Sequence, residues 1–544
     1  MYCRKRCYYR ISLRPRMLSP FKLQRLLQAV NSKVLRIIAM NRNSLCSRRV
    51  SHASAFCPVL LVFAIGLAIV TSANAQTTLV KLSTDTFHDS DAQHRTEVEP
   101  DTFAWESTIV SAFQVARIAD GGGADVGFAT STDAGKTWTS GYLPGLTDNY
   151  KGGSFTAASD AAVAYDAKHG VWLISTLPII NNNGEAVATS RSTDGIHWGK
   201  PIIVDNSGSD DKNWITCDNT ATSPHYGNCY TEWDEPGQGD LIFMSTSTDG
   251  GLTWGPAKNT ADNAGGLGGQ PLVLPNGTVV VPISGFGTMI AFRSTDGGKS
   301  WTSSSFIANQ NFRGEDGGLR DGFGMPTAQI DGGGKIYMVW PDCSFRSGCS
   351  TDDLVLTTST NGTTWTKIAR IPIDPITSTV DHFLPGIGVD RATSGKTAHV
   401  AVTYYNYPVA ACNNSCKLYV GYTISEDGGK TWTKGKELAG PMELSWLPNS
   451  QNGLMVADYL AVAYANGNPF GVFAVAKAPS GGQLNEAMYT TKSPLLAAAD
   501  EPRVSSKGEK PAPNAKGKYV WKYYDDDGNY PIPPAKQGRP LKQK

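Results

Sequence analysis

A short phrase occurs six times along the chain, and its spacing limits the folds that the rest of the sequence can adopt. Four copies read Ser-x-Asp-x-Gly-x-x-Trp, while the second and fifth are one residue shorter and the fifth has Asn in place of Asp. The first serines of successive copies lie 61, 55, 47, 65 and 66 residues apart. Self-similarity at such a period is typical of architectures built from one repeated structural unit. The six copies span 131–138, 192–198, 247–254, 294–301, 359–365 and 425–432.

Each copy predicts a tight turn between two strands. Asp or Asn followed by Gly between apolar runs favours a hairpin, because the side-chain oxygen can accept hydrogen bonds from backbone N–H groups of the turn and Gly can adopt a positive φ. The Trp that follows begins the return strand and offers a large apolar face to the next unit. The Asp residues of the repeated phrase are therefore expected to form turns and not to catalyse.

The segments between the copies predict short antiparallel strands and no long amphipathic helix. In one unit, residues 326–330, 335–340 and 353–357 are expected to form three strands, and a fourth begins at Trp365 after the fifth copy. Four antiparallel strands per repeat are typical of a propeller blade. We therefore predict an all-β chain that forms a β-propeller of four-stranded antiparallel blades.

Seven blades are predicted, with six as the alternative. After the sixth copy, three further strands are expected at 457–462, 471–476 and 486–490. A strand at 78–83 can supply the fourth strand of this last blade. Closing the ring in that way removes exposed sheet edges.

Residues 1–75 are expected to be an N-terminal extension that ends in a secretory signal. They contain 13 Lys and Arg residues and no acidic residue. An apolar run over 59–70 precedes the small-residue site at 73–75, which places the cleavage before Gln76. We therefore expect a secreted or periplasmic protein that has no membrane contact after the signal is removed.

The charge of the chain changes once this segment is set aside. The full sequence has 49 Lys and Arg and 48 Asp and Glu residues, so the part after residue 75 has 36 basic and 48 acidic residues and a net charge of −12. Such a charge argues against nucleic acid as a partner. The propeller is expected to span 76–492, and the Lys-, Pro-, Gly- and Asp-rich residues 493–544 are expected to be disordered.

Six of the ten cysteines lie outside the N-terminal extension, and they form three local pairs. Disulfides suit an exported protein in an oxidising compartment. Zinc ligation is the alternative, but no pair has the second Cys or His pair that a zinc site requires. We predict the disulfides Cys217–Cys229, Cys343–Cys349 and Cys412–Cys416.

The blade pattern assigns the loops to two faces. The turns between first and second strands, and between third and fourth strands, share the face that carries all six copies of the phrase. The other face carries the remaining loops, two of which contain a cysteine pair that can brace a preformed site. The alternative is that its charged residues are ordinary solvated side chains. These residues are Arg117, Asp120, Arg313, Glu315, Asp316, Arg320, Asp321, Asp342, Arg346, Tyr405 and Tyr407.

The repeated phrase resembles the Asp-box (BNR) repeat, and residues 77–492 resemble the sialidase (neuraminidase) superfamily of secreted β-propellers. Sialidases of this superfamily bind the substrate carboxylate with three arginines and use a Tyr nucleophile assisted by Glu, together with an Asp acid/base. The resemblance implies a glycoside hydrolase, similar to an exo-α-sialidase, that acts on terminal acidic sugars or a related glycan. The alternative is a non-catalytic Asp-box propeller that binds a glycan or a protein.

The resemblance also implies roles for particular residues. Asp120 matches the acid/base that precedes the first Asp box, and Asp125 matches it less well. Glu315 and Tyr405 would form the nucleophilic pair, with two other tyrosines, Tyr404 and Tyr459, as alternatives. Guanidinium groups bind a carboxylate through paired, charge-assisted hydrogen bonds. The arginines that could do so are Arg117, Arg313, Arg320 and Arg346.

One segment departs from the family pattern. Sialidases begin with a Phe/Tyr-Arg-Ile-Pro segment that supplies the first arginine, whereas the corresponding stretch here, 97–100, reads Glu-Val-Glu-Pro. A sialidase site requires three of the four arginines to converge on one carboxylate. We treat that convergence as the structural criterion for the assignment.

No cofactor is expected, and the chain is expected to act on its glycan as a monomer. No zinc-type His pattern and no EF-hand series of ligands occurs. Several acidic residues recur at the starts of blades, where they would cap the first strands. A structural calcium ion near the channel is the alternative. The residues concerned are Glu99, Asp160, Asp210, Asp211 and Asp458.

Overall fold

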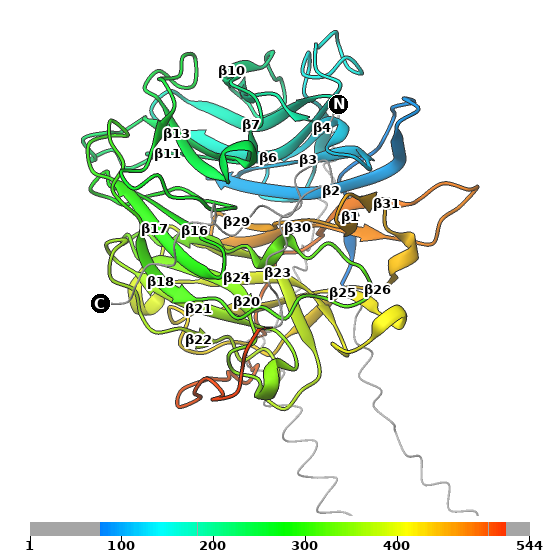
Figure 1. Ribbon diagram of the computed structural model, residues 1–544, viewed down its shortest axis with the longest axis vertical. Helices are drawn as coiled ribbons and strands as arrows, with labels where there is room; N and C mark the ends of the chain where they lie inside the picture. The colour runs from blue at the N-terminus through cyan, green and yellow to red at the C-terminus, as the bar shows by residue number, and fades with distance from the viewer. Residues whose placement is uncertain (1–76, 182, 499, 518–544) are drawn as a thin grey trace, which may run out of the picture. The chain divides into compact units, whose positions relative to one another are not determined.

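The computed structural model describes residues 77–181, 183–498 and 500–517 (Figure 1). The predicted signal and extension lie outside the described residues. Within the described ranges the chain is all β, with six short 3-10 helices and no α-helix. None of the described helices has the length and hydropathy needed to cross a bilayer. The 3-10 helices are η1 (Pro236–Gln238), η2 (Gly322–Gly324), η3 (Ser347–Cys349), η4 (Gly395–Thr397), η5 (Asn413–Ser415) and η6 (Leu444–Trp446).

The strands assemble into antiparallel groups of four that follow the chain. The first two groups are joined into one sheet by the pair Gly123–Ala158. The first group contains β2 (Ala92–Trp105), β3 (Thr108–Ile118), β4 (Gly123–Ser131) and β5 (Thr139–Tyr142). The second contains β6 (Ala157–Asp166), β7 (Val171–Ile180), β9 (Val187–Ser192) and β10 (Ile202–Asp205), with the short β8 (Asn183–Gly184) beside β7.

Four more groups follow as separate four-stranded sheets. The third group contains β11 (Asp211–Cys217), β12 (Cys229–Glu235), β13 (Leu241–Ser247) and β14 (Lys258–Asn259). The fourth contains β15 (Leu272–Val273), β16 (Val279–Ser284), β17 (Thr288–Ser294) and β18 (Ser305–Asn309). The fifth contains β19 (Thr327–Ile330), β20 (Ile336–Asp342), β21 (Asp353–Ser359) and β22 (Ala369–Arg370). The sixth contains β23 (Asp381–Val389), β24 (Val400–Tyr407), β25 (Lys417–Ser425) and β26 (Lys436–Glu443).

The last sheet combines the two ends of the described chain. Its order is β1-β31-β30-β29, so β1 (Leu79–Lys81) pairs with β31 (Glu486–Thr491) in an antiparallel register that sets Val80 opposite Thr490. This confirms the prediction that the N-terminal strand joins three strands beyond the sixth copy. The other strands of the sheet are β29 (Ala461–Ala465) and β30 (Asn468–Ala476), and a separate small hairpin comprises β27 (Asn449–Ser450) and β28 (Gly453–Leu454).

The first strands of the seven groups contact one another in sequence. β2 contacts β6, β6 contacts β11, and the contacts continue through β15, β19, β23 and β29. β29 in turn contacts β2, so the series returns to its start. Figure 1 shows β2, β6 and β29 next to one another, although β29 is far from the other two strands in the sequence.

The repeated phrase forms the turn that its residues predict. In the first copy the Ser131 hydroxyl donates to Asp133 Oδ1 (2.8 Å) and accepts from the backbone N–H of Gly135 (2.8 Å). Asp133 Oδ1 also accepts from the backbone N–H of Thr137 (2.9 Å). The Thr137 hydroxyl and the backbone N–H groups lower the pKa of Asp133 to about 2. Asp133 is thus a turn-forming carboxylate, as expected from the sequence.

The Trp of the phrase packs between neighbouring groups. Trp301 in the fourth copy meets Phe292 of its own sheet edge to face, with ring centroids 5.7 Å apart, and Tyr230 of the preceding sheet at 6.3 Å. Only 4 % of its surface is exposed. The buried Trp side chain therefore contributes to the core between two sheets, while the Ser, Asp and Gly of the same phrase form the turn.

A glycine substitution tests this packing. Gly135 has φ +83°, and a Cβ there would lie 2.6 Å from the ring of Phe470 in the last sheet, whereas Gly152 has φ +71° and open space around it. We expect Gly135→Ala to cost about 2 kcal/mol or more, because it adds a steric clash to the strain of a positive φ. Gly152→Ala carries the strain alone and is expected to cost about 1 kcal/mol. Thermal unfolding of both variants measures the difference, and equal losses would contradict the packing described.

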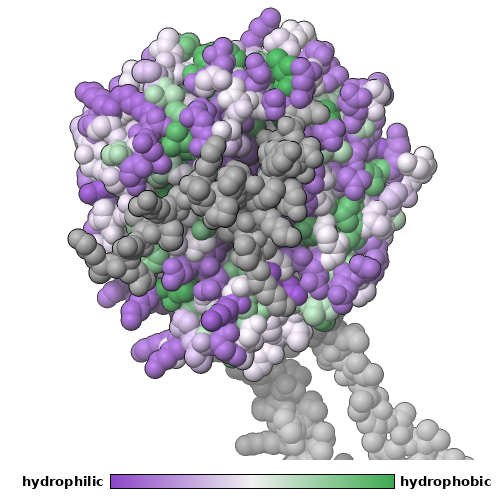
Figure 2. Space-filling model, viewed as in Figure 1, coloured by the Kyte–Doolittle hydropathy of each residue, from purple (hydrophilic) through white to green (hydrophobic). Residues whose placement is uncertain are grey.

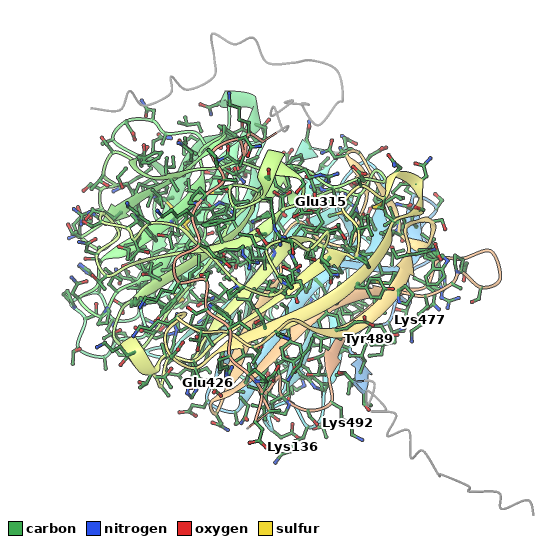
Figure 3. The ribbon with its side chains drawn as sticks, turned by 90° about the horizontal axis from the view of Figure 1, so that it is seen from below. Lys136, Glu315, Glu426, Lys477, Tyr489 and Lys492 are labelled. Atoms are coloured by element: carbon green, nitrogen blue, oxygen red, sulfur yellow. A yellow bond between two sulfur atoms is a disulfide. The ribbon has the colours of Figure 1, made fainter. Side chains whose placement is uncertain are left out.

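The two faces expected from the strand order are present. Lys136 and Glu426, in the first and sixth copies, lie on the opposite side of the molecule from Glu315 (Figure 3). On the described surface visible in Figure 2, hydrophilic residues are interspersed with small groups of apolar ones. Loops on the face opposite the repeated phrases are therefore available to form a site.

Three disulfides are present within residues 77–517, as far as the structure describes them, and they confirm the predicted pairs. Cys217–Cys229 joins the ends of β11 and β12, while the other two close the loops between β20 and β21 and between β24 and β25. Disulfides of this kind are typical of proteins in an oxidising compartment.

The segment that precedes residue 518 is packed against the sheets, in contrast to the disordered tail expected from residue 493. Val504 and Trp432 exchange two backbone hydrogen bonds of 2.8 Å, Arg370 Nε lies 2.9 Å from Glu509 Oε2, and Ala512 N–H donates to Ser344 O (2.7 Å). The amino-acid composition of this segment did not predict that it is ordered. The groups that hold it are individual backbone and charged groups elsewhere in the chain, which composition does not reveal.

Candidate functional site

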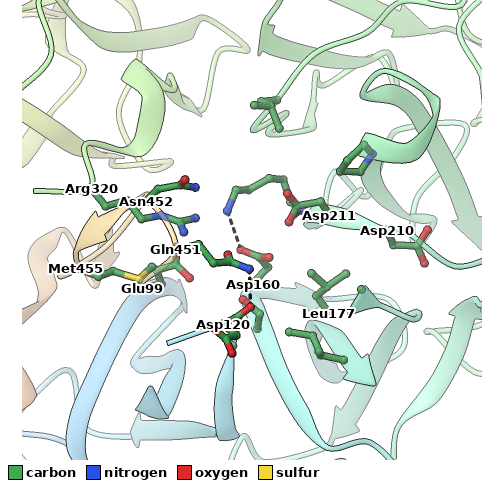
Figure 4. Close-up of a pocket in the computed structure, with 18 of the residues that line it drawn as sticks. Glu99, Asp120, Asp160, Leu177, Asp210, Asp211, Arg320, Gln451, Asn452 and Met455 are labelled. Carbon is green, nitrogen blue, oxygen red and sulfur yellow. Dashed lines mark hydrogen bonds and ion pairs between the residues drawn. The ribbon is translucent and has the colours of Figure 1, made fainter. Parts of the chain in front are cut away.

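A pocket lies where the first strands of the early groups meet the loops that lead into β19 and β29 (Figure 4). Its volume is about 980 Å³ including open solvent at the mouth. Its lining includes loops between second and third strands, which the strand order places on the face opposite the repeated phrases. Concave sites lined by several convergent polar groups are the usual places for small ligands. The charged groups that line it include Glu99, Arg117, Asp160, Lys212 and Arg320.

Three of these residues occupy bulges in the first strands. Glu99 in β2, Asp160 in β6 and Lys212 in β11 have φ values of 56°, 42° and 51°, and the strand register shifts next to each of them. Residues other than glycine rarely adopt such φ values, and bulges redirect side chains near binding sites. At each bulge the regular alternation of side chains between the two faces of the strand is interrupted. The three charged side chains at these bulges all line the same pocket.

A buried ion network forms the wall of the pocket. Asp458 accepts hydrogen bonds from Arg320 Nε (2.7 Å) and Lys212 Nζ (2.8 Å), and Lys212 Nζ lies 3.6 Å from Asp160 Oδ1. Burial alone would raise the pKa of Asp458, but Arg320 and then Lys212 hold that pKa well below its usual range. These two cations are therefore engaged by protein carboxylates.

Arg117 forms no such ion pair with a carboxylate in the part of the chain that the structure describes. Its Nη1 donates to Gln114 Oε1 (3.0 Å) and to the backbone oxygen of Gly122 (2.8 Å), while its Nε has no hydrogen-bond partner among the described residues. The side chain is only 2 % exposed. Burial, and next the nearby Arg320, lower the pKa of Arg117 to about 10, so it remains a cation at neutral pH. A buried guanidinium with free donor capacity is suited to an anionic ligand.

Glu99 presents a neutral carboxyl group beside this cation. The carboxamide of Gln114 connects the two, because its Nε2 donates to Glu99 Oε2 and its Oε1 accepts from Arg117. The other oxygen, Glu99 Oε1, has no hydrogen-bond partner among the residues that the structure describes. Burial, followed by the negative charge of Asp458, raises the pKa of Glu99 to about 8. Glu99 is consequently protonated at neutral pH and can donate a proton.

The raised pKa of Glu99 predicts a pH dependence of stability. A carboxyl group whose pKa is higher in the folded than in the unfolded protein stabilises the fold fully below the unfolded value, 4.5, and loses that contribution as pH rises through about 8. We expect the melting temperature to fall between these pH values and the fall to be shallower in Glu99→Gln. Calorimetric scans at a series of pH values would measure it, and an unchanged slope in the variant would contradict the assignment.

Tyr459 lies behind Asp160. Its hydroxyl is 3.3 Å from Asp160 Oδ1, and its ring meets Trp214 edge to face at 5.0 Å. Burial, followed by the charges of Asp160 and Glu99, keeps the pKa of Tyr459 well above 10. Its role here is therefore to donate to and orient the Asp160 carboxylate.

The residues selected from the sequence are distributed over several places. Asp120, Arg117 and Arg320 all line the pocket, and the backbone oxygen of Asp120 accepts from Gln451 Nε2 (2.5 Å). Arg313 and Arg346 lie outside the pocket lining. Two of the four arginines share the pocket, so the described residues do not assemble the three-arginine carboxylate site that the resemblance implies.

Arg313 and Arg346 are held by carboxylates of their own. Arg313 Nη1 lies 3.2 Å from Asp381 Oδ2, and Arg346 Nη2 lies 2.5 Å from Asp353 Oδ1 and 2.9 Å from Asp374 Oδ1. These ion pairs stabilise the loops near β21 and β23.

Glu315 and Tyr405 also lie outside the pocket lining. The pKa of Glu315 is raised well above its usual range by burial and next by Asp321 and Asp381. The Tyr405 hydroxyl donates to the backbone oxygen of Ala474 (2.8 Å) inside the core, where the side chain is fully buried. The structure therefore brings neither residue to Arg117, and Tyr459 is the tyrosine nearest to the pocket carboxylates.

The acidic residues noted at the starts of the blades do meet at this pocket. Glu99, Asp160, Asp210 and Asp211 line it, and Asp458 lies in its wall. A separate group, Asp353, Asp374 and His382, has ligand atoms within 4.8 Å of one another, but Arg346 and Arg370 already neutralise its two carboxylates. That group is poorly suited to a cation.

Sequence reasoning missed Gln114, Gln451 and Lys212, and it considered Glu99 only as a strand cap or a calcium ligand. The available signal was the recurrence of charged residues where each first strand begins, which we had interpreted as capping. What the sequence did not indicate was the bulge that redirects those side chains. Such a bulge breaks the alternation of a strand at one residue only.

The sequence matches no protein-family model and no curated protein. Similar solved structures include the NanB sialidase from Streptococcus pneumoniae, with 15 % identity over 76 % of this chain and 70 % of that chain and a TM-score of 0.36. The intramolecular trans-sialidase from Ruminococcus gnavus has 13 % identity over 79 % of this chain and 99 % of that chain, with a TM-score of 0.37. A polysaccharide lyase of family PL25, an ulvan lyase, has 11 % identity over 76 % and 96 % and a TM-score of 0.44. These similarities are too distant to carry an argument about function.

Proposed function

We propose that this protein is a secreted, glycan-active β-propeller that binds an acidic sugar in the Arg117 pocket and hydrolyses its glycosidic bond. The observation that carries the proposal is the buried guanidinium of Arg117, which has no carboxylate partner and is connected through Gln114 to the neutral carboxyl of Glu99. The resemblance of the repeated phrase to the Asp box points to the same class of ligand.

Seven blades are proposed for the propeller. The support is the cycle of contacts among the seven first strands and the pairing of β1 with β31, which joins the two ends of the described chain in one sheet. Secretion is supported by the three disulfides and by the signal-like sequence before Gln76.

The proposed chemistry uses two carboxyl groups with different roles. Arg117 binds the carboxylate of the sugar through charge-assisted hydrogen bonds. Glu99, protonated at neutral pH, gives its proton to the oxygen of the leaving group. Asp160, oriented by Tyr459, accepts a proton from the attacking water, so that one water is consumed for each bond cleaved. Asp120, which also lines the pocket, is another candidate for proton transfer.

A non-catalytic binding propeller is the second candidate. It is favoured by the placement of Glu315 and Tyr405 away from Arg117, since these residues would form the nucleophilic pair of a sialidase. In that case the pocket would bind an acidic glycan without cleaving it.

Release of methylumbelliferone from a panel of acidic and neutral glycosides tests the proposal. We expect turnover of an acidic glycoside by the parent protein, a loss of at least 100-fold in kcat for Glu99→Gln and for Asp160→Asn, and a smaller loss for Asp120→Ala. Activity should fall as pH rises through about 8, when Glu99 loses its proton. Binding of the acidic glycoside without turnover would favour the binding propeller, and the absence of both would refute the proposed ligand class.

A further inference from the structure

A second pocket lies at the far ends of β2, β23 and β29, on the face of the repeated phrases. It measures about 830 Å³ including its mouth and is lined by Phe103, Trp105, Arg391 and Tyr464, among others. Trp105 is six residues beyond Glu99 along β2, which corresponds to roughly 20 Å of extended strand. The second pocket is therefore a separate cavity from the one that contains Arg117.

Arg391 is a cation in the lining of this pocket for which the described residues provide no ion pair. Its guanidinium lies over the ring of Phe103 at 5.5 Å, and among residues 77–517, as far as the structure describes them, it has no carboxylate within ion-pair distance and no hydrogen-bond partner. By comparison, the side chains of Arg320, Arg346 and Arg370 are all held by carboxylates. Arg391 thus retains the donor capacity that those arginines have used.

The two acids near Arg391 do not satisfy it. Asp390 Oδ1 accepts from the backbone N–H of Ala392 (3.0 Å), and its Oδ2 lies 3.7 Å from His399 Nδ1. Glu106, the other acidic residue of the lining, is exposed to solvent. Burial lowers the pKa of Arg391, and the negative charge of Asp218 opposes that shift.

Aromatic rings form the other part of the lining. Trp105 packs beside Tyr165 with centroids 5.3 Å apart, and Phe103 meets Trp172 edge to face at 6.3 Å. Trp105 and Phe103 are only half-buried, and both line the pocket. A partly open indole offers an apolar face to the C–H face of a pyranose ring, and a nearby guanidinium can bind a charged substituent.

We propose that this pocket is a second saccharide-binding site that takes a sugar unit with an acidic group, the ring lying against Trp105 and the acidic group on Arg391. The inference rests on the proposed glycan function, but it does not require catalysis. Two sites on opposite faces of one chain would let the protein hold an acidic glycan at one face while the Arg117 pocket engages another unit.

Calorimetric titration of the full chain with 3′-sialyllactose, and with lactose as the neutral control, tests this site. We expect two binding sites for the acidic sugar in the parent protein and one in Arg117→Gln. In the Arg117→Gln background, Arg391→Gln and Trp105→Ala should each weaken the remaining site at least 10-fold. Lys477→Gln, which removes an exposed cation next to Tyr489 (4.9 Å; Figure 3), is the matched control and should leave that site unchanged.

The outcomes separate this inference from the proposed function. Loss of all binding in Arg117→Gln, or remaining binding that is indifferent to Arg391→Gln, would overturn the second site and leave the first intact. A single site that is lost in Arg391→Gln but retained in Arg117→Gln would support the second site and refute the first. No binding by the parent would refute both. Arg391→Lys, which keeps the charge, should keep most of the affinity, and melting temperatures would verify that each variant is folded.

Discussion

Replacement of Arg117 by glutamine is expected to raise the KM for an acidic glycoside by about 10- to 150-fold. Hydrogen bonds to charged groups contribute about 1.5–3 kcal/mol, and the variant loses the charge that would bind the carboxylate of the sugar. Gln keeps a polar side chain of related length, and the fold should change little because Arg117 has no carboxylate partner to leave unpaired. Kinetics with a neutral glycoside provide the comparison, since that substrate should be affected much less.

Arg320→Gln is the control within the same pocket. Arg320 is engaged by Asp458, so its replacement should mainly reduce stability and not selectively weaken the binding of an acidic ligand. If Arg117→Gln lowered the affinity for acidic and neutral glycosides equally, the role of Arg117 as the carboxylate-binding group would be refuted.

Asp458→Ala is expected to destabilise the protein by about 3–5 kcal/mol. The carboxylate of Asp458 is buried and binds Arg320 Nε at 2.7 Å and Lys212 Nζ at 2.8 Å, so its removal leaves two buried cations without their main partner. Breaking a buried ion pair from one side carries this cost because the desolvated charge is no longer compensated. Urea unfolding followed by tryptophan fluorescence would measure the change.

Two further variants make this prediction specific. Asp120→Ala removes an exposed carboxylate of the same pocket and is expected to change stability by no more than about 0.5 kcal/mol. In the Asp458→Ala background, Lys212→Met removes one of the uncompensated cations and should recover part of the loss. A loss below about 1 kcal/mol for Asp458→Ala would show that the network does not hold the pocket wall.

Much of the fold could be predicted because its signals are local. The Ser, Asp and Gly of each phrase act within one turn, so residues such as Ser131 and Asp133 reveal their hydrogen bonds from spacing alone. Cys343 and Cys349 are six residues apart and pair within one loop. The pairing of β1 with β31 was also predictable, since an incomplete last sheet needs a fourth strand.

The site was harder to predict because it depends on contacts between distant segments. Arg346 has the same charge as Arg117 in the sequence, but Asp353 and Asp374 engage it in the structure. Nothing in the sequence around Tyr405 shows that its hydroxyl is already paired. In the structure this hydroxyl donates a hydrogen bond to the backbone oxygen of Ala474. The loop pattern indicated the face on which the candidate pocket lies, but it could not show which side chains are already paired.

The bulges explain a further difference. Glu99 falls where the resembling family has a different segment, and a period of two along β2 gives no reason to place its side chain in a pocket. The φ of 56° at Glu99 turns its side chain toward the pocket, and burial then raises the pKa of its carboxyl group. The chemical character of Glu99 is therefore a consequence of tertiary structure and could not be inferred from its position in the sequence.

The most direct test of the central claim compares two ligands that differ only in the charge that Arg117 is proposed to bind. Affinities of the Arg117 pocket for the methyl glycoside of N-acetylneuraminic acid and for its methyl ester would be measured by calorimetry in an Arg391→Gln background, so that the second pocket does not contribute. The account predicts that the ester binds at least 10-fold more weakly than the acid and that Arg117→Gln removes this difference. Equal affinity for acid and ester in the presence of Arg117 would contradict it.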